Sequence, residues 1–275
     1  MSTSTHEAVT RADEGAVAWL TLKRPEAMNA LSDRVLADLG THVASIEDDP
    51  DVRVVVVTST GRAFCAGADL KEILGSEGQV DPARLLAFEK RAADTFARLA
   101  ALPKPVIAAL NGVTMAGGLE LALHCDLVVA SADARLGDGH INYGMLPGAG
   151  GAARLPRVIG PTRAKYLAFT GTLLAADDAR AMGLVNEVVP ADDLVHRADE
   201  LAAMLAARSP SALRLFKQAI DDGLDQPLPS ALRLERLATA EHLHSGDVAE
   251  GLMAFSEKRA PRFETTGRPT DDRPQ

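Results

Sequence analysis

The chain has 275 residues, of which 47% are hydrophobic and 24% are charged. This length and composition allow a substantial buried core and exclude a disordered chain. The formal net charge of −9 argues against general nucleic-acid binding, because such proteins use basic surface to displace counterions from phosphates.

The sequence gives no sign of export or membrane insertion. No apolar run approaches the roughly 20 residues that cross a bilayer. The first 15 residues have neither the hydrophobic segment of a secretory signal nor the acid-poor composition of a mitochondrial presequence. The two cysteines, Cys65 and Cys125, stand in no metal-binding spacing. We therefore expect reduced thiols, no metal and a cytoplasmic protein without a membrane segment.

The first half of the chain alternates strand patterns with glycine-containing loops. Strands are predicted at residues 16–22, 52–59, 104–110 and 127–132. The continuous β-branched run at 52–59 is typical of a strand buried on both faces of a sheet. Ser32 is placed to cap the helix that follows it, and residues 81–102 have helical periodicity. Residues 111–118 are predicted to form a turn before a short helix.

From about residue 149 the pattern is mostly helical, and the last predicted helical stretch covers roughly 229–260. The repeated strand–turn–strand–helix order predicts an α/β fold of stacked ββα turns followed by helices. We place the core at 8–200 and a helical segment suited to oligomer contacts at 201–263. The tail at 264–275, rich in Pro, Thr and Asp, is expected to be disordered.

Two loops carry the residue types of a catalytic site. In the loop 63–72, small residues at 66–68 let a backbone amide approach a ligand closely. Gly117 and Gly118 precede the short helix, whose first amides lack partners and favour negative charge. Glu120 lies in an apolar stretch of that helix, where burial raises the pKa of a carboxyl. Together they indicate an oxyanion hole beside a general acid or base, which suits a reaction through a thioester enolate.

A dinucleotide site is the alternative for the glycines further on. Gly148, Gly150 and Ala153 form a GxGxxA pattern. No convincing strand precedes it, however, and no acidic residue ends a second strand about 20 residues later, as the dinucleotide fingerprint requires. The pattern is better interpreted as a turn at the start of a helix.

Six segments, in this order, resemble the enoyl-CoA hydratase/isomerase (crotonase) family: LKRPEAMNAL, GRAFCAGADLKE, KPVIAALNGVTMAGGLELALHCDLVVAS, LPGAGGAARLPRVIG, GLVNEVVP and EGLMAFSEKRAPRF. The resemblance runs from about residue 8 to 263. It implies a spiral of ββα turns with C-terminal helices that form a homotrimer, often a dimer of trimers. It also implies an acyl-CoA thioester substrate and no cofactor besides the coenzyme A of that substrate.

The resemblance also assigns site residues. The amides of Ala68 and Gly117 would form the oxyanion hole, and Glu120 matches the first of two catalytic glutamates in family hydratases. Residues expected to contact coenzyme A or the acyl group are Arg24, Ala27, Ala66, Asp69, Leu70, Lys71, Gly148, Lys258 and Phe263. Within this set, the backbone at 66–70 would line the adenine pocket. Arg24, Ala27 and Lys258 would lie along the phosphates, and Phe263 would close the pantetheine channel.

The second catalytic glutamate is replaced. An ungapped count places His140 where family hydratases carry that residue, shortly before the PGAGG segment. Histidine, with an ordinary pKa near 6.5, serves as acid or base at neutral pH. We interpret Glu120 and His140 as sharing the two roles, the alternative being that His140 is a spectator. The sequence leaves open whether burial lowers or a charged neighbour raises the pKa of His140. His124 is interpreted as structural.

The sequence thus predicts a hydro-lyase of fatty acid metabolism that reversibly adds water to a 2-enoyl-CoA. Because His140 departs from the family pattern, isomerisation, decarboxylation or thioester hydrolysis in the same oxyanion hole is an alternative. A non-catalytic acyl-CoA- or RNA-binding protein of the same fold is a second alternative. The negative net charge and the retained Glu120 argue against it.

Overall fold

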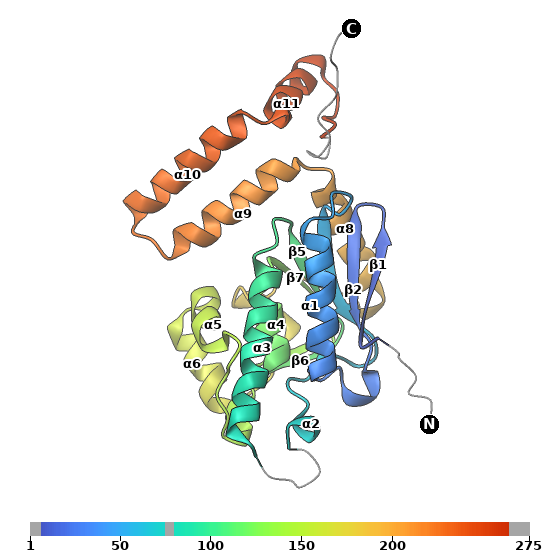
Figure 1. Cartoon of the computed structure of the whole chain (residues 1–275), viewed down its shortest axis with the longest axis vertical. Coiled ribbons are helices and arrows are strands. Elements are labelled where there is room, and N and C mark those ends of the chain that lie inside the picture. Colours follow the sequence, from blue (N-terminus) through green and yellow to red (C-terminus); the bar gives the residue numbers. More distant parts are fainter. Residues whose placement is uncertain (1–6, 75–79, 264–275) are drawn as a thin grey trace.

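The computed structural model describes residues 7–74 and 80–263, which form two sheets covered by helices (Figure 1). The larger sheet contains, in spatial order, β1 (Val9–Glu14), β2 (Val17–Leu22), β3 (Val54–Ser59), β5 (Val106–Leu110), β7 (Leu127–Ser131) and β10 (Glu187–Val189). The smaller sheet contains β4 (Ala63–Cys65), β6 (Val113–Met115), β8 (Arg135–Gly137) and β9 (Leu174–Ala175). The tail at 264–275 lies outside the described residues.

The helices of the described residues are α1 (Asp33–Glu47), α2 (Leu70–Leu74), α3 (Pro82–Ala100), α4 (Gly117–Ala122), α5 (Gly151–Ile159), α6 (Pro161–Thr170), α7 (Ala176–Ala181), α8 (Leu194–Ala206), α9 (Pro210–Leu224), α10 (Leu228–Leu243) and α11 (Gly246–Glu257). Three short 3₁₀ helices are η1 (Pro25–Ala27), η2 (His140–Tyr143) and η3 (Ala191–Asp193). Within the described residues, no helix has the length and hydropathy needed to cross a bilayer.

The chain winds as a spiral in which each turn supplies one strand to each sheet. β3 is followed by β4, β5 by β6 and β7 by β8, and a helix follows each pair. Neighbouring turns pair in parallel in both sheets. The predicted spiral of ββα turns is confirmed. The predicted turn at 111–118 is wrong in part, because three of its residues form β6 in the smaller sheet.

The larger sheet is buried on both faces, as the run at 52–59 predicts. Val55 and Val57 of β3 face the main core, which α1 and α3 cover. Val54 and Val56 face a second apolar cluster under α8. Because successive side chains of a strand point to opposite faces, four consecutive valines fill both clusters.

The C-terminal helices α9 to α11 extend away from the two sheets (Figure 1). The expected boundary at 200/201 falls inside α8, which packs on the sheet with Leu201 and Ala202. The extension therefore begins at α9. The helical stretch predicted at 229–260 forms two helices, because the chain bends between α10 and α11. The buried carboxylate of Asp247 accepts hydrogen bonds from Ser209 and Ser211 there, which holds α11 against the start of α9.

Two local features place the loops of the candidate site. The Ser32 hydroxyl accepts a hydrogen bond from the Val35 amide and caps α1 as predicted. The buried side chain of Asn29 donates to the carbonyls of Thr60 and Ala63, which fixes the loop before α1 on the loop before β4. At the start of α4, a Cβ atom on Gly118 would stand 2.1 Å from the carbonyl oxygen of Cys65. Only glycine allows this close approach.

Gly118→Ala is expected to lower the free energy of unfolding by about 1–3 kcal/mol, because the new methyl group must push α4 away from the backbone of β4. Urea denaturation monitored by circular dichroism measures the change. Gly251→Ala in α11 is the control, since its Cβ would meet nothing within 4 Å. It should be neutral or slightly stabilising. Equal stability of Gly118→Ala and the wild type would contradict the packing described.

Candidate active site

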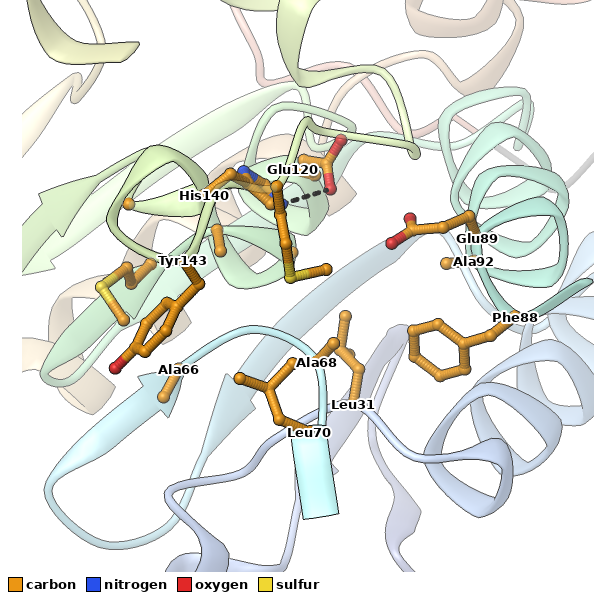
Figure 2. Close-up of a pocket in the computed structure, with 15 residues that line it drawn as sticks. Leu31, Ala66, Ala68, Leu70, Phe88, Glu89, Ala92, Glu120, His140 and Tyr143 are labelled. Atoms are coloured by element: carbon orange, nitrogen blue, oxygen red, sulfur yellow. Dashed lines mark ion pairs between the residues drawn. The ribbon is translucent and has the colours of Figure 1, made fainter. Parts of the chain in front are cut away.

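A small cavity of about 50 Å³ lies between α3, the loop before α2, the start of α4 and η2 (Figure 2). Predicted site residues that line it are Ala66, Ala68, Leu70, Gly117, Glu120 and His140. Residues from three turns of the spiral, far apart in the sequence, therefore meet in one cavity.

The two predicted oxyanion-hole loops lie against each other. Gly67 has φ of +100°, and a Cβ on it would stand 2.9 Å from the Cβ of Ala116. Ala116 itself has φ of +51°, a left-handed value that costs energy for a residue with a side chain. The following amide, that of Gly117, and the amide of Ala68 have no hydrogen-bond acceptor within the described residues. Two such donors in one cavity wall are suited to bind a developing oxyanion.

Glu120 is buried in the wall of the cavity, with 2% of its surface exposed. Its Oε1 atom accepts hydrogen bonds from the amides of Ala149 and Gly151, each at 2.8 Å. Its Oε2 atom faces His140, 3.8 Å from the imidazole Nε2 (Figure 2). Backbone amides thus fix one carboxylate oxygen, and the other faces His140 and the cavity.

His140 is oriented by a neighbouring carboxylate. Its Nδ1–H donates to Oδ1 of Asp138 at 2.9 Å, and its backbone amide donates to the same oxygen at 3.1 Å. Asp138 is itself buried. Because Nδ1 is hydrogen-bonded to Asp138, Nε2 is the nitrogen that faces Glu120 and the cavity.

The charges of the site answer the question that the sequence leaves open. Burial lowers the pKa of His140, but the hydrogen bond and charge of Asp138, with the charges of Glu120 and Glu89, outweigh it and raise the pKa above 6.5. Burial raises the pKa of Glu120, while the Gly151 amide, His140 and the Ala149 amide oppose this. The arrangement favours an imidazolium as the acid and a backbone-bonded carboxylate as the base.

Two polar residues of the site were missed from the sequence. Asp138 precedes His140 by two residues, and only the tight backbone at Gly139, with φ of +68°, shows that the two side chains meet. Glu89 projects from α3 into the cavity (Figure 2). The sequence feature that could have identified Glu89 is its position on the apolar face of the predicted helix, next to Phe88.

Several predicted contacts lie beside the cavity rather than in its wall. Arg24 donates to the carbonyl of Ala30 and forms an ion pair with Asp69 at 2.9 Å. Ala27 belongs to η1, and Lys71 is exposed on α2. These four predicted residues surround the loop that carries Ala66 and Ala68. Their expected contacts with coenzyme A stay predictions.

The remaining predicted contacts are placed elsewhere. Gly148 lies behind Glu89, since a Cβ on it would stand 2.3 Å from the Oε2 atom of that carboxyl. Lys258 caps the C-terminal end of α11, a helix that lies far from α2 (Figure 1). The carbonyl of Phe263 accepts a hydrogen bond from Arg53, just before β3. The single chain therefore does not bring Lys258 or Phe263 to the cavity.

His124 is packed and neutral. Its Nδ1 bonds to the carbonyl of Glu120 at 2.8 Å, and its ring centroid lies 5.6 Å from that of Phe96. Burial lowers its pKa to about 4. The geometry agrees with the structural interpretation of this histidine.

Comparisons with known proteins point in the same direction as the fold and the cavity. The sequence pattern of the enoyl-CoA hydratase/isomerase family matches residues 12–266. A short-chain-enoyl-CoA hydratase of Clostridium acetobutylicum is 39% identical over 250 residues, which are 90% of this chain and 93% of that protein. The chain belongs to the enoyl-CoA hydratase/isomerase family.

Solved structures support the same assignment. The crystal structure of an enoyl-CoA hydratase from Bacillus anthracis superposes with a TM-score of 0.90 at 38% identity and covers 94% of this chain and 99% of that one. An enoyl-CoA hydratase structure from Geobacillus kaustophilus HTA426 has a TM-score of 0.88 at 40% identity, covering 94% and 98%. The chain has the crotonase fold and is an enzyme of this family.

The contact between Asp138 and His140 predicts a titration. The imidazole of His140 should titrate above pH 6.5 in the wild type and at lower pH in Asp138→Asn, because the neutral amide removes the carboxylate that stabilises the imidazolium. The imidazolium therefore stabilises the fold at pH below about 6.5, and this contribution is lost as the pH rises through the folded pKa.

The measurement is the pH dependence of the His140 Cε1–H signal in carbon-edited NMR spectra. Asp177→Asn is the control, because among the described residues Asp177 forms only an exposed ion pair with Arg180. A wild-type signal that titrates below pH 6.5, or one that Asp138→Asn leaves in place, would refute the assigned charge state.

Proposed function

We propose that the protein catalyses the reversible addition of water to a 2-enoyl-CoA thioester. The observation that carries the proposal is the pair formed by Glu120 and His140, whose Oε2 and Nε2 atoms lie 3.8 Å apart in the cavity that also contains the amides of Ala68 and Gly117. Base, acid and oxyanion donors are the three elements that hydration through an enolate requires. The names of the similar hydratases support the same reaction.

The proposed substrate places its thioester oxygen on the amides of Ala68 and Gly117. These amides lie at the start of α4 and in the loop before α2, so neither needs to move when negative charge develops. The double bond then lies beside Glu120 and His140. The cavity volume of about 50 Å³ suits a short acyl chain.

In the proposed reaction, the Glu120 carboxylate removes a proton from water as the water oxygen forms a bond to Cβ. The π electrons of the C=C bond move to the thioester oxygen, which the two amides stabilise as an enolate oxyanion. The enolate collapses as its Cα takes the proton from Nε2 of the His140 imidazolium. Transfer of a proton from Oε2 of Glu120 back to Nε2 across the 3.8 Å gap, directly or through water, restores both groups.

We extend the proposal to the setting of the reaction. The chemistry above uses only side chains and amides of this chain, so it needs no metal and no cofactor besides the coenzyme A of the substrate. The acyl-CoA substrate is consistent with the family, and fatty acid metabolism is the setting that we propose for it. The cytoplasm is the compartment that we propose.

Glu120→Gln and His140→Gln should each lower kcat for crotonyl-CoA hydration by about 10²–10⁴, because each removes a proton-transfer group and preserves approximate shape. Loss of the enoyl ultraviolet absorbance measures the rate. Asp177→Asn, which changes an exposed carboxylate away from the cavity, should keep wild-type rates. A wild type that hydrates no 2-enoyl-CoA, or a Glu120→Gln enzyme with full activity, would overturn the proposed function.

We also propose that α9 to α11 assemble the chain into a homotrimer or a dimer of trimers. Large apolar side chains are exposed on these helices, including Phe216 at 70%, Leu237 at 67% and Phe255 at 85%. Such a surface is unusual for a monomer and typical of a subunit interface.

Sedimentation equilibrium should give about three or six times the chain mass of 28.9 kDa. Phe216→Asp should shift the mass toward the monomer, because it places a charge in the expected interface. Leu146→Asp is the control, since Leu146 is 80% exposed but lies before α5, outside these helices. A monomeric wild type would refute the assembly.

A further inference from the structure

Glu89 is a carboxyl group of the cavity that the proposed reaction does not use. It projects from α3 beside Phe88 and Ala92 and points across the cavity toward Glu120 (Figure 2). Within the described residues its side chain makes no hydrogen bond and no ion pair. The carboxylates of Glu120 and Asp138, in contrast, are held by backbone amides or by the imidazole.

The backbone behind Glu89 makes room for its carboxyl group. A Cβ at Gly148 would stand 2.3 Å from Oε2 and 2.6 Å from Cδ of Glu89. A side chain at position 148 would therefore displace the carboxyl group. Gly148 belongs to the same loop that supplies the amides for Glu120, so one loop supports both carboxyl groups.

A half-buried carboxyl group without a partner is unfavourable in the free protein. Burial, and then the charge of Glu120, raise its pKa, while His140 opposes the shift. A leucine at this position would pack against Phe88 and Ala92 without that cost. A polar group that lacks a protein partner and faces a cavity is suited to bind a ligand.

We propose that Glu89 selects the acyl group: the cavity takes short chains that carry a hydrogen-bond donor, such as a hydroxyl group, beyond the reacting carbons and rejects chains that end in a carboxylate. This inference rests on the proposed function only in that the cavity holds the acyl part of a CoA thioester. Glu89 accepts the hydrogen bond of the donor.

The negative charge of the carboxyl groups around the cavity is the reason why an acyl chain that ends in a carboxylate is rejected. Three carboxyl groups, those of Glu89, Glu120 and Asp138, surround one imidazole, that of His140. A further carboxylate on the acyl chain would add a like charge to a small and poorly solvated space. A hydroxyl group adds no charge and supplies the donor that Glu89 lacks.

The test measures the binding of three saturated thioesters of equal chain length: butyryl-CoA, 4-hydroxybutyryl-CoA and succinyl-CoA. Isothermal titration calorimetry gives the dissociation constants. The wild type should bind 4-hydroxybutyryl-CoA about tenfold more tightly than butyryl-CoA, as expected for a hydrogen bond to a carboxylate. Succinyl-CoA should bind at least about tenfold more weakly than butyryl-CoA.

Three variants separate charge from hydrogen bonding. Glu89→Gln should keep part of the preference for the hydroxyl group and lose most of the rejection of succinyl-CoA. Glu89→Leu should bind butyryl-CoA and 4-hydroxybutyryl-CoA equally. Gly148→Ala should change the ratios in the same direction as Glu89→Leu. Asp94→Asn is the matched control, because it removes an exposed carboxylate of α3 that pairs with Lys90, and it should keep the wild-type ratios.

Equal wild-type affinities for the three thioesters, or unchanged ratios in Glu89→Leu, would overturn the inference. An equal loss of kcat on crotonyl-CoA and 4-hydroxycrotonyl-CoA in Glu89→Gln, without a change in the binding ratios, would also overturn it and make Glu89 part of the proton transfer. Saturated thioesters are not hydrated, so the binding ratios decide this inference even where hydration fails and the proposed function falls.

Discussion

Two backbone amides hold one oxygen of Glu120, and the geometry of the cavity depends on this contact. The amides of Ala149 and Gly151 each donate at 2.8 Å, and they join α4 of one spiral turn to the loop before α5 and the first residue of α5 in the next. With Oε1 fixed in this way, the side chain cannot rotate without breaking two buried hydrogen bonds. Oε2 is therefore held in one direction, toward His140 and the cavity.

The histidine changes the electrostatics of the site rather than only its shape. Two carboxyl groups at this distance would share a proton, because both cannot ionise at low cost. An imidazolium beside a carboxylate is instead a stable pair of opposite charges, and Asp138 adds a second anionic partner on the other nitrogen. In the proposed reaction, the acid and base roles are thus set by charge before the substrate arrives. The same charges hold the imidazole in one orientation.

The sequence predicts the parts of this structure that depend on local patterns. The valine run at 52–59 identifies a strand buried on both faces, and Ser32 marks the start of α1. The three-residue strands β4, β6 and β8 are too short for a periodic signal, and their pairing in the second sheet is a tertiary effect. Ordered motifs indicate the family, and the residues predicted from them include six of the fifteen that line the cavity.

Side-chain contacts across the cavity could not be read in the same way. Glu89 interrupts the apolar face of α3, and only the fold shows that this face borders the cavity at that point. The bend between α10 and α11 likewise depends on Asp247 and Ser209, which are 38 residues apart. Contacts of this kind join turns of the chain that no local pattern relates.

Substrate selection and proton transfer share one electrostatic environment. The charge of Glu89 helps to raise the pKa of His140. In the proposed complex, a hydroxyl group that donates to Glu89 takes up part of that negative charge. The imidazolium is then less strongly stabilised and becomes a stronger acid toward Cα. A chain without a donor leaves Glu89 unpartnered, so its desolvation disfavours the complex. A donor on the acyl chain thus favours both binding and protonation, because both depend on the same charge.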